Sequence, residues 1–156
     1  MIRRAEEKDI PAVISLLEQV LTVHHNARPD LFKAAATKYS PEQLKEIFAD
    51  DSRPVFVRTD DQDQVLGYAF CIHKQQKDDR ILTDIRTLYI DDLCVDEASR
   101  GQHIGRELYE YVLSYAKEQG CYNVTLNVWN GNDSAIRFYE SLGMKPQKIG
   151  METILQ

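Results

Sequence analysis

The sequence predicts an α/β fold, a single domain with a mixed, mostly antiparallel sheet and helices on both faces of that sheet. Its 156 residues suit one domain with its own core, and no repeat, low-complexity tract or linker divides residues 1–156. Short apolar or alternating runs and longer runs with helical spacing follow one another along the chain. The expected order of elements is β-α-α-β-β-β-α-β-α-β.

The first third of the chain predicts one strand and two helices. Residues 2–5 form a short strand, and apolar side chains then recur at helical spacing over residues 10–21. Residues 24–38 have no clean period, which predicts a loop with some helix. The second helix, 41–48, is expected to begin with a capping box that opens at Ser40.

The middle of the chain predicts three strands. Residues 54–58 and 65–73 are expected to pair through a hairpin turn over residues 59–64. A charged turn then leads into a long strand over residues 81–95, in which apolar and polar side chains alternate imperfectly. Such an irregularity is expected near a β-bulge or a functional site.

The last third predicts two more helices and further strands. Residues 104–115 have a helical stripe that ends at Gly120, the usual C-terminal glycine. Residues 124–128 alternate as a half-buried strand, and residues 135–142 trace a short helix. Residues 145–155 can make one or two final strands.

Composition excludes several classes of protein. Apolar residues at 43% and charged residues at 28% are ordinary globular values. No apolar run is long enough to span a membrane, and the charged N-terminus does not resemble a signal peptide. A net charge of −6 argues against nucleic-acid binding. We expect a soluble, cytoplasmic protein without a nucleic-acid or membrane partner.

The cysteines and histidines do not form a metal-binding pattern. Cys71, Cys94 and Cys121 are odd in number and widely spaced, and they lack the spacing of zinc ligands. We interpret them as small buried hydrophobic residues, with a reactive thiol at Cys94 as the alternative. His24 and His25 have no further ligand at metal spacing, so we predict no metal.

The stretch SRGQHIGREL, residues 99–108, predicts an anion site. A strand, a glycine-containing loop and a helix follow one another here, and the first amides of a helix have no partners within it. The amides from Gln102 to Arg106 are therefore expected to hold a phosphate or diphosphate, with Arg100 and Arg106 balancing its charge. A P-loop is excluded because Arg106 and Glu107 follow Gly105, and the glycine spacing does not fit a dinucleotide fingerprint.

Two motifs carry a family resemblance. The pattern L-x-V-x-x-x-x-R-G-x-x-I-G, from Leu93 to Gly105, resembles the acetyl-coenzyme A motif of GNAT superfamily N-acetyltransferases. Downstream, the segment from Leu126 to Met144, with Asn132 and Phe138-Tyr139-Glu140, resembles the second signature of that family. The motifs are separated by one helix and one strand, as the family requires, and the resemblance covers nearly the whole chain.

The resemblance implies acetyl-coenzyme A (acetyl-CoA) as the co-substrate. Strand residues 93–95 would pair with the pantetheine arm through backbone groups, one of which could also face the thioester oxygen. The cofactor-binding residues it implies are Leu93, Cys94, Val95, Arg100, Gly101, Gln102, His103, Ile104, Gly105, Arg106, Asn132 and Tyr139. Asn132 can also be an ordinary helix cap. His103 replaces a glycine of the usual pattern, and we expect it to adopt a helical backbone conformation.

The resemblance also implies catalytic residues. Tyr139 lies where the family places the general acid that protonates the departing thiolate, although a core tyrosine is the alternative; a phenol with a pKa of ~10 stays protonated at neutral pH. Asp91 or Asp92 would act as general base or as counter-ion to the ammonium, and Asp91 occupies the position where relatives often carry glutamate. Strand alternation predicts that the two carboxylates face opposite sides, so that they cannot both act directly. Residues 24–32 would close over the acceptor.

The sequence and its family resemblance favour one function for the protein and leave two alternatives. The favoured one is an enzyme that transfers acetyl from acetyl-CoA to a primary amine of a small molecule or peptide by direct attack. The alternatives are a coenzyme A-binding sensor without turnover and a transferase of a larger acyl group. Polyamines, aminoglycosides, amino acids and lysine side chains suit the acidic residues equally well. Family members commonly pair through terminal strands, so residues 145–155 could form a homodimer.

Overall fold

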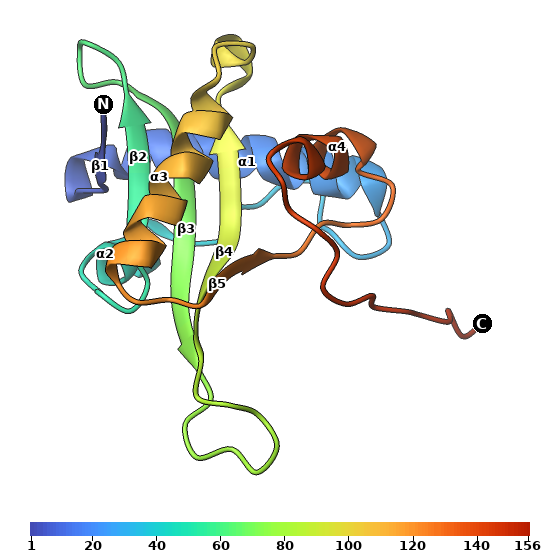
Figure 1. Cartoon of the computed structure of the whole chain (residues 1–156). Helices are drawn as coiled ribbons and strands as arrows, with labels where there is room; N and C mark the ends of the chain where they lie inside the picture. The colour runs from blue at the N-terminus through green and yellow to red at the C-terminus, as the bar shows by residue number, and fades with distance from the viewer.

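The computed structural model describes all residues from 1 to 156 as a five-stranded sheet with four helices (Figure 1). The strands are β1 (Ile2–Arg4), β2 (Val55–Thr59), β3 (Val65–Gln75), β4 (Arg86–Val95) and β5 (Asn123–Leu126), in that spatial order. The helices are α1 (Ile10–Ala27), α2 (Pro41–Phe48), α3 (Ile104–Glu118) and α4 (Asp133–Ser141), with short 3-10 turns at Glu7–Asp9 and Glu97–Ser99. Only β4 and β5 are parallel, so the predicted fold class is confirmed.

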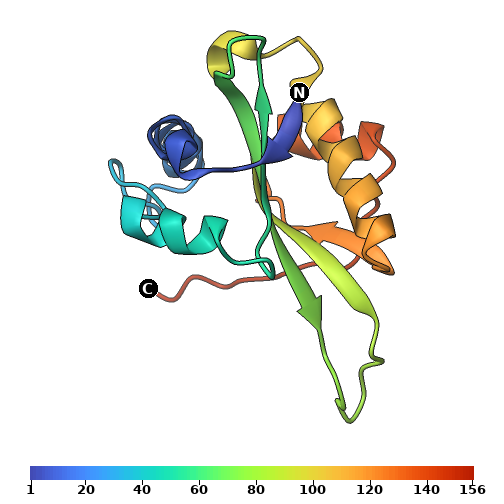
Figure 2. The same ribbon diagram turned by 90° about the vertical axis from the view of Figure 1, so that its left-hand side faces the viewer.

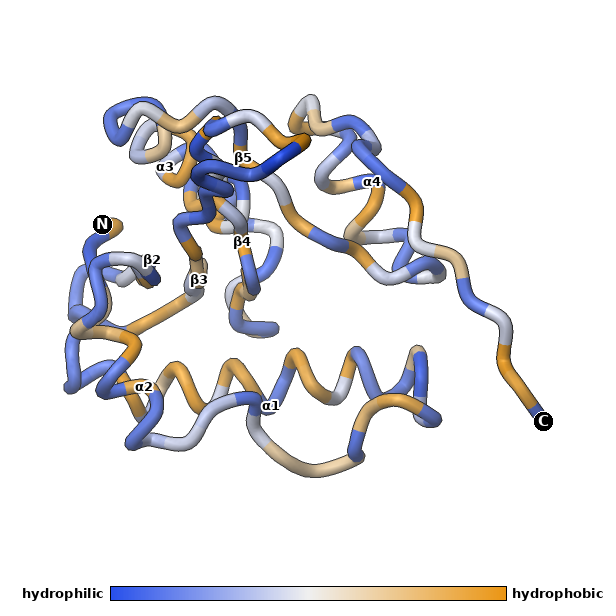
Figure 3. Tube along the Cα trace, turned by 90° about the horizontal axis from the view of Figure 1, so that it is seen from below, coloured by the Kyte–Doolittle hydropathy of each residue, from blue (hydrophilic) through white to orange (hydrophobic).

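The two faces of the sheet are covered by different helices. Helices α1 and α2 lie on one face and α3 and α4 on the other (Figure 2), and the view from below shows the same layers (Figure 3). Alternation along the strands divides the core accordingly. Val57 and Phe70 pack in the core under α1 and α2, whereas Phe56 and Ala69 pack in the core under α3.

Local sequence explains where α2 begins. The Ser40 side chain accepts a hydrogen bond from the amide of Gln43, whose side chain accepts one from the Ser40 amide. This capping box was predicted, and Pro41 follows it at the first helical position, where its missing donor is not needed. Leu44 and Ile47 then bury one stripe of the helix against α1.

Strands β4 and β5 diverge, and this divergence opens the sheet. They pair only over Thr87–Ile90 and Asn123–Leu126, so β4 has no neighbour on that side from Asp91 onward. On its other side β4 pairs with β3, with a shift of register between Phe70 and Cys71. Asp91 is the residue that this β-bulge leaves without a partner.

Two predicted strands differ from the structure. The strand predicted over residues 81–95 begins at Arg86, because β3 ends opposite it and residues 76–85 form the connection. Residues 145–156 form no strand: the segment is extended and leaves the body (Figure 1), with the Ile149, Met151 and Leu155 side chains exposed. An alternating pattern predicts a strand conformation but not the edge that would pair with it. None of the helices combines the length and the apolar character that a membrane span requires.

Candidate active site

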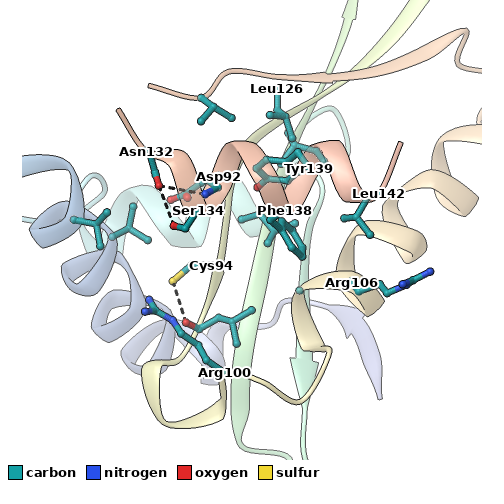
Figure 4. Close-up of a pocket in the computed structure, with 18 of the residues that line it drawn as sticks. Asp92, Cys94, Arg100, Arg106, Leu126, Asn132, Ser134, Phe138, Tyr139 and Leu142 are labelled. Carbon is teal, nitrogen blue, oxygen red and sulfur yellow. Dashed lines mark hydrogen bonds between the residues drawn. The ribbon is translucent and has the colours of Figure 1, made fainter. Parts of the chain in front are cut away.

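A cavity of about 770 Å³ lies where β4 and β5 separate, between the start of α3, helix α4 and the second half of α1. It is lined by every predicted site residue except Gln102. Its α3 end is formed by residues 99–106, and its other end, called here the bulge end, by Val20, Val23, His24, Asp91, Asp92 and Trp129. Figure 4 shows 18 of the residues that line it.

The α3 end offers a row of unpaired amides. None of the six amides from Gly101 to Arg106 donates a hydrogen bond within the protein, and the first amide of this region to do so is that of Glu107, to the carbonyl of His103. Six free donors at the positive end of a fifteen-residue helix form a strong site for an anion. The geometry therefore suits the phosphate-binding role that the motif predicted.

His103 differs from the expectation of a helical conformation. Its backbone is left-handed, with φ 62° and ψ 18°, and Gly101 nearby also has a positive φ of 86°. An L residue in this region is strained by roughly 1–2 kcal/mol, which explains why a glycine suits the position. The turn, rather than the helix, therefore sets the direction of the amides that precede α3.

The two predicted arginines are placed differently. Arg100 forms no ion pair, while Arg106 Nε lies 2.9 Å from Glu110 Oε1 one helical turn on. Their side chains extend in opposite directions from the loop (Figure 4). Arg100 thus has its charge available to an anion in the cavity, whereas that of Arg106 is already shared with Glu110.

The backbone of β4 presents hydrogen-bonding groups to the cavity. The amide of Asp96 donates to Leu66, and from this pair the antiparallel ladder alternates, so that Cys94 and Asp92 bond to β3. The main-chain groups of Leu93 and Val95 point the other way, toward the side where β5 has diverged. Of the three predicted strand residues, Leu93 and Val95 therefore offer free backbone groups and Cys94 does not.

Cys94 behaves as a buried residue. The residue is 5% exposed, and burial raises the pKa of its thiol to about 12. A thiol that stays protonated is a poor nucleophile, so the environment does not favour the alternative of a reactive Cys94.

Tyr139 lies on the cavity-facing side of α4 beside Phe138 (Figure 4). Its hydroxyl has no hydrogen-bond partner within the protein, although its ring packs 6.4 Å from that of Tyr109. Burial, together with the nearby charge of Asp92, raises the pKa of Tyr139 above its ordinary value. The hydroxyl is therefore a protonated group with a free donor position that faces the cavity.

Alternation predicted that the carboxylates of Asp91 and Asp92 lie on opposite faces of the sheet. In the structure they lie on the same face. The β-bulge at Asp91 interrupts the alternation, and both side chains turn toward the α1 and α2 side, where both line the cavity. Asp91 Oδ2 accepts hydrogen bonds from Lys38 Nζ at 2.8 Å and Tyr39 OH at 3.0 Å. Asp92 Oδ2 accepts one from Tyr68 OH at 2.7 Å.

The two carboxylates differ in charge environment. Asp91 is neutralised by the Lys38 ion pair, but the only side-chain partner of Asp92 is a neutral phenol. Burial raises the pKa of Asp92 to about 6, even though the Tyr68 hydrogen bond acts in the opposite direction. Asp92 is therefore the carboxylate whose pKa is suited to exchanging a proton near neutral pH.

Aromatic side chains close the bulge end. The rings of His24 and Phe32 stack at 4.9 Å, and the Phe32 ring meets that of Trp129 edge to face at 5.5 Å. Phe32 thus links the end of α1 to the segment between β5 and α4. Residues 24–32 were predicted to lie over this region; His24 does line the cavity, whereas the ring of His25 bonds to the Phe32 carbonyl.

Sequence reasoning missed several residues here. Trp129, Tyr68, Tyr39 and Lys38 were not singled out, and their roles depend on tertiary contacts. The only signal in the sequence that pointed to this end of the cavity was the break in apolar alternation around Asp91.

Asn132 caps α4 by accepting a hydrogen bond from the Ala135 amide at 3.3 Å, and its side chain also lines the cavity, so the two roles considered for it are compatible. The structure contains no group of three or more side chains that could hold a metal ion.

Comparisons with known proteins identify relatives of this chain. The sequence model of the acetyltransferase (GNAT) family matches residues 20–144. A crystal structure of a mutant BH1408 protein from Bacillus halodurans has a TM-score of 0.95 and 33% identity, covering 100% of this chain and 99% of that one. Peptidyl-lysine N-acetyltransferase YjaB from Salmonella typhimurium is 25% identical over 146 residues, 92% of this chain and 82% of the relative. Glucosamine 6-phosphate N-acetyltransferase from Arabidopsis thaliana is 35% identical over 63 residues, which is 40% of either chain.

The family match extends over most of the chain and includes both motifs of the cavity. The resemblance noted from the sequence is thereby confirmed, and the chain belongs to the acetyltransferase (GNAT) family.

Proposed function

We propose that the protein transfers an acetyl group from acetyl-CoA to a primary amine by direct attack of the amine on the thioester. The observation that carries the proposal is the row of six free amides from Gly101 to Arg106 beside the open edge of β4. This arrangement suits a ligand that has a diphosphate at one end and an amide-containing arm at the other.

Acetyl-CoA, when bound, would supply the activated acetyl thioester. The amides of residues 101–106 and the Arg100 side chain would hold its diphosphate. The free main-chain groups of Leu93 and Val95 would pair with its pantetheine arm as a neighbouring strand does. Asn132 would contact the same ligand from α4, while continuing to cap that helix.

Tyr139 is proposed as the general acid. As the bond between the acetyl carbon and sulfur breaks, its hydroxyl would give its proton to the departing sulfur. The support is its position in the cavity, its free donor and a pKa that burial raises. A main-chain amide of β4 facing the thioester oxygen would stabilise the negative charge that develops there.

The acidic pair at the bulge is proposed to receive the amine. An ammonium entering this end of the cavity meets Asp91 and Asp92, and it must lose a proton before its nitrogen can attack. Asp92, with a pKa of about 6 and no cationic partner, suits the role of proton acceptor. Asp91, held by Lys38 and Tyr39, would act as the fixed counter-charge beside it.

The C-terminal segment is proposed to form a homodimer contact. Along residues 145–156 the apolar side chains of Ile149, Met151, Ile154 and Leu155 are 61–91% exposed, and such a group suits a contact surface that a partner would cover. A second copy offers the same segment by symmetry. Light scattering of the whole chain and of a chain ending at Lys145 would test this: a dimer that becomes monomeric on truncation is expected, and a monomeric whole chain would refute it.

The test of the function combines binding and turnover. Titration calorimetry should detect acetyl-CoA binding, and release of the free thiol in the presence of primary amines should follow their addition. A folded protein that ignores acetyl-CoA would refute the proposal. Binding without thiol release on any amine would instead support the sensor interpretation.

A further inference from the structure

The bulge end carries two carboxylates, and only one of them has a cationic partner. Among its lining residues Asp91 and Asp92 are acidic, and Asp91 is already paired with Lys38 at 2.8 Å. His24 also lines this end, and burial together with the charge of Lys38 lowers its pKa, so its imidazole is neutral at neutral pH. One carboxylate, that of Asp92, is left without a cationic partner.

No free cation lines this end. The two arginines that line the cavity, Arg100 and Arg106, both belong to the α3 end, as does His103, and the one histidine of the bulge end is the neutral His24. Lys38 is taken up by Asp91, and Lys74 lies outside the lining, with its ammonium 4.1 Å from the ring centre of Tyr89. A phosphate or carboxylate carried by the amine would therefore be desolvated here without a partner.

The walls of the bulge end are apolar. Val20 and Val23 line it from α1, and Trp129 lines it from the segment after β5. The stacked pair of His24 and Phe32 joins these two walls, because Phe32 also contacts the Trp129 ring. A hydrocarbon or aromatic frame would be covered by these side chains, whereas the several ammonium groups of a polyamine would meet one uncompensated carboxylate.

We propose that the acceptor is a primary amine with a single positive charge at the end of an apolar stem, which enters between Trp129 and α1 and delivers its ammonium to Asp92. This inference rests on the proposed acetyl transfer and narrows the class of amine that accepts the acetyl group. A free monoamine and a lysine side chain share this chemistry. Amino sugar phosphates and polycationic amines do not.

The first experiment measures kcat/KM by thiol release with four acceptors: phenethylamine, a peptide with one lysine and a blocked N-terminus, glucosamine 6-phosphate, and spermine. We expect at least one of the first two to exceed both of the others by about tenfold or more, the difference that about 1.4 kcal/mol would make. Phenethylamine and the peptide distinguish a free amine from a protein side chain. A preference for glucosamine 6-phosphate or spermine would overturn the inference.

A matched pair of variants tests whether the acceptor contacts the Trp129 ring. Trp129→Ala removes an aromatic wall of the bulge end, whereas Tyr122→Ala removes an aromatic ring that is 75% exposed and lies outside the cavity. With the preferred monoamine, we expect KM to rise about fivefold or more for Trp129→Ala and to stay unchanged for Tyr122→Ala. An unchanged KM in Trp129→Ala would overturn the proposed entry route.

Acetyl-CoA binding, measured first by calorimetry, distinguishes failure of the acceptor inference from failure of the proposed function. If acetyl-CoA binds and neither phenethylamine nor the lysine peptide is acetylated, the acceptor inference is wrong, while the cofactor site stands. If acetyl-CoA does not bind, the proposed function itself is wrong.

Discussion

The two ends of the cavity are built in different ways. The α3 end consists of consecutive backbone amides from Gly101 to Arg106, so it occupies one short stretch of sequence. The bulge end is assembled from side chains of α1, β4 and the segment after β5, and Lys38 and Tyr68, which bond to its carboxylates, come from two further segments. A site made of backbone leaves a contiguous motif, and a site made of side chains leaves almost none.

The largest effect is expected from Asp92→Asn. An amide cannot accept the proton of the ammonium, so kcat/KM should fall by about 10²-fold or more, the usual contribution of a general base. In the unchanged protein, kcat/KM should rise with pH through about 6, because Asp92 must lose its proton to act. Thiol-release assays across pH 5–8 would measure both.

Asp9→Asn is the matched control for that change. Asp9 is also buried, at 3% exposure, but it pairs with Arg3 and lies outside the cavity. Its substitution should reduce stability and leave the activity of the folded fraction intact. If Asp92→Asn retained activity within about threefold, Asp92 would not be the proton acceptor, and the role would pass to Asp91.

Tyr139→Phe should reduce kcat by about 10²-fold, because the departing sulfur would no longer receive a proton from the protein. Affinity for acetyl-CoA should change little, since the ring remains in place. Tyr109→Phe serves as the control, because its ring packs against that of Tyr139 but does not line the cavity. Equal rates for both variants would show that Tyr139 acts by packing alone.

Asp92→Asn should also stabilise the protein. The pKa of Asp92 is about 6 in the folded state, against about 3.9 in the unfolded chain, so folding disfavours the charged form. At about pH 3 and below, the group is protonated in both states and contributes no difference. Between about pH 4 and pH 6 the group ionises in the unfolded chain but not yet in the folded protein, so the folded protein loses about 3 kcal/mol that the asparagine variant keeps, as two pKa units imply. Urea unfolding at about pH 3 and about pH 8 would reveal the gap at the higher pH only.

At the α3 end, Gly105→Val tests close approach to the backbone. A Cβ at Gly105 would lie 3.1 Å from Phe138 Cζ, so a branched side chain would push α4 away from the start of α3. We expect acetyl-CoA affinity to fall by about tenfold, which corresponds to about 1.4 kcal/mol. Gly150→Val, where an added Cβ would meet nothing within 4 Å, is the control for calorimetry. Equal affinities would place the ligand elsewhere.

The sequence predicted the α3 end and the capped α2 because each depends on neighbours in the chain. Ser40 and Gln43 form their box within one turn, and the amides after Gly101 need only a turn and a helix. The bulge end escaped prediction because a shift of one residue between Phe70 and Cys71 decides which way Asp91 points. Register is fixed by pairing across the sheet, which alternation along one strand does not report.

The smallest effect is expected at His103, where the sequence departs from glycine and the backbone is left-handed. His103→Gly would remove strain of about 1–2 kcal/mol and give back about 0.5–1 kcal/mol through the greater freedom of glycine in the unfolded chain. The free energy of unfolding should therefore rise by about 0.5–1 kcal/mol in urea titrations. Acetyl-CoA affinity should change less than threefold or so, since the amides of this end remain. Gly101→Ala, at φ 86°, should do the opposite and destabilise. A loss of stability in His103→Gly would mean that the imidazole holds the turn, and then the α3 end would depend on a side chain as the bulge end does.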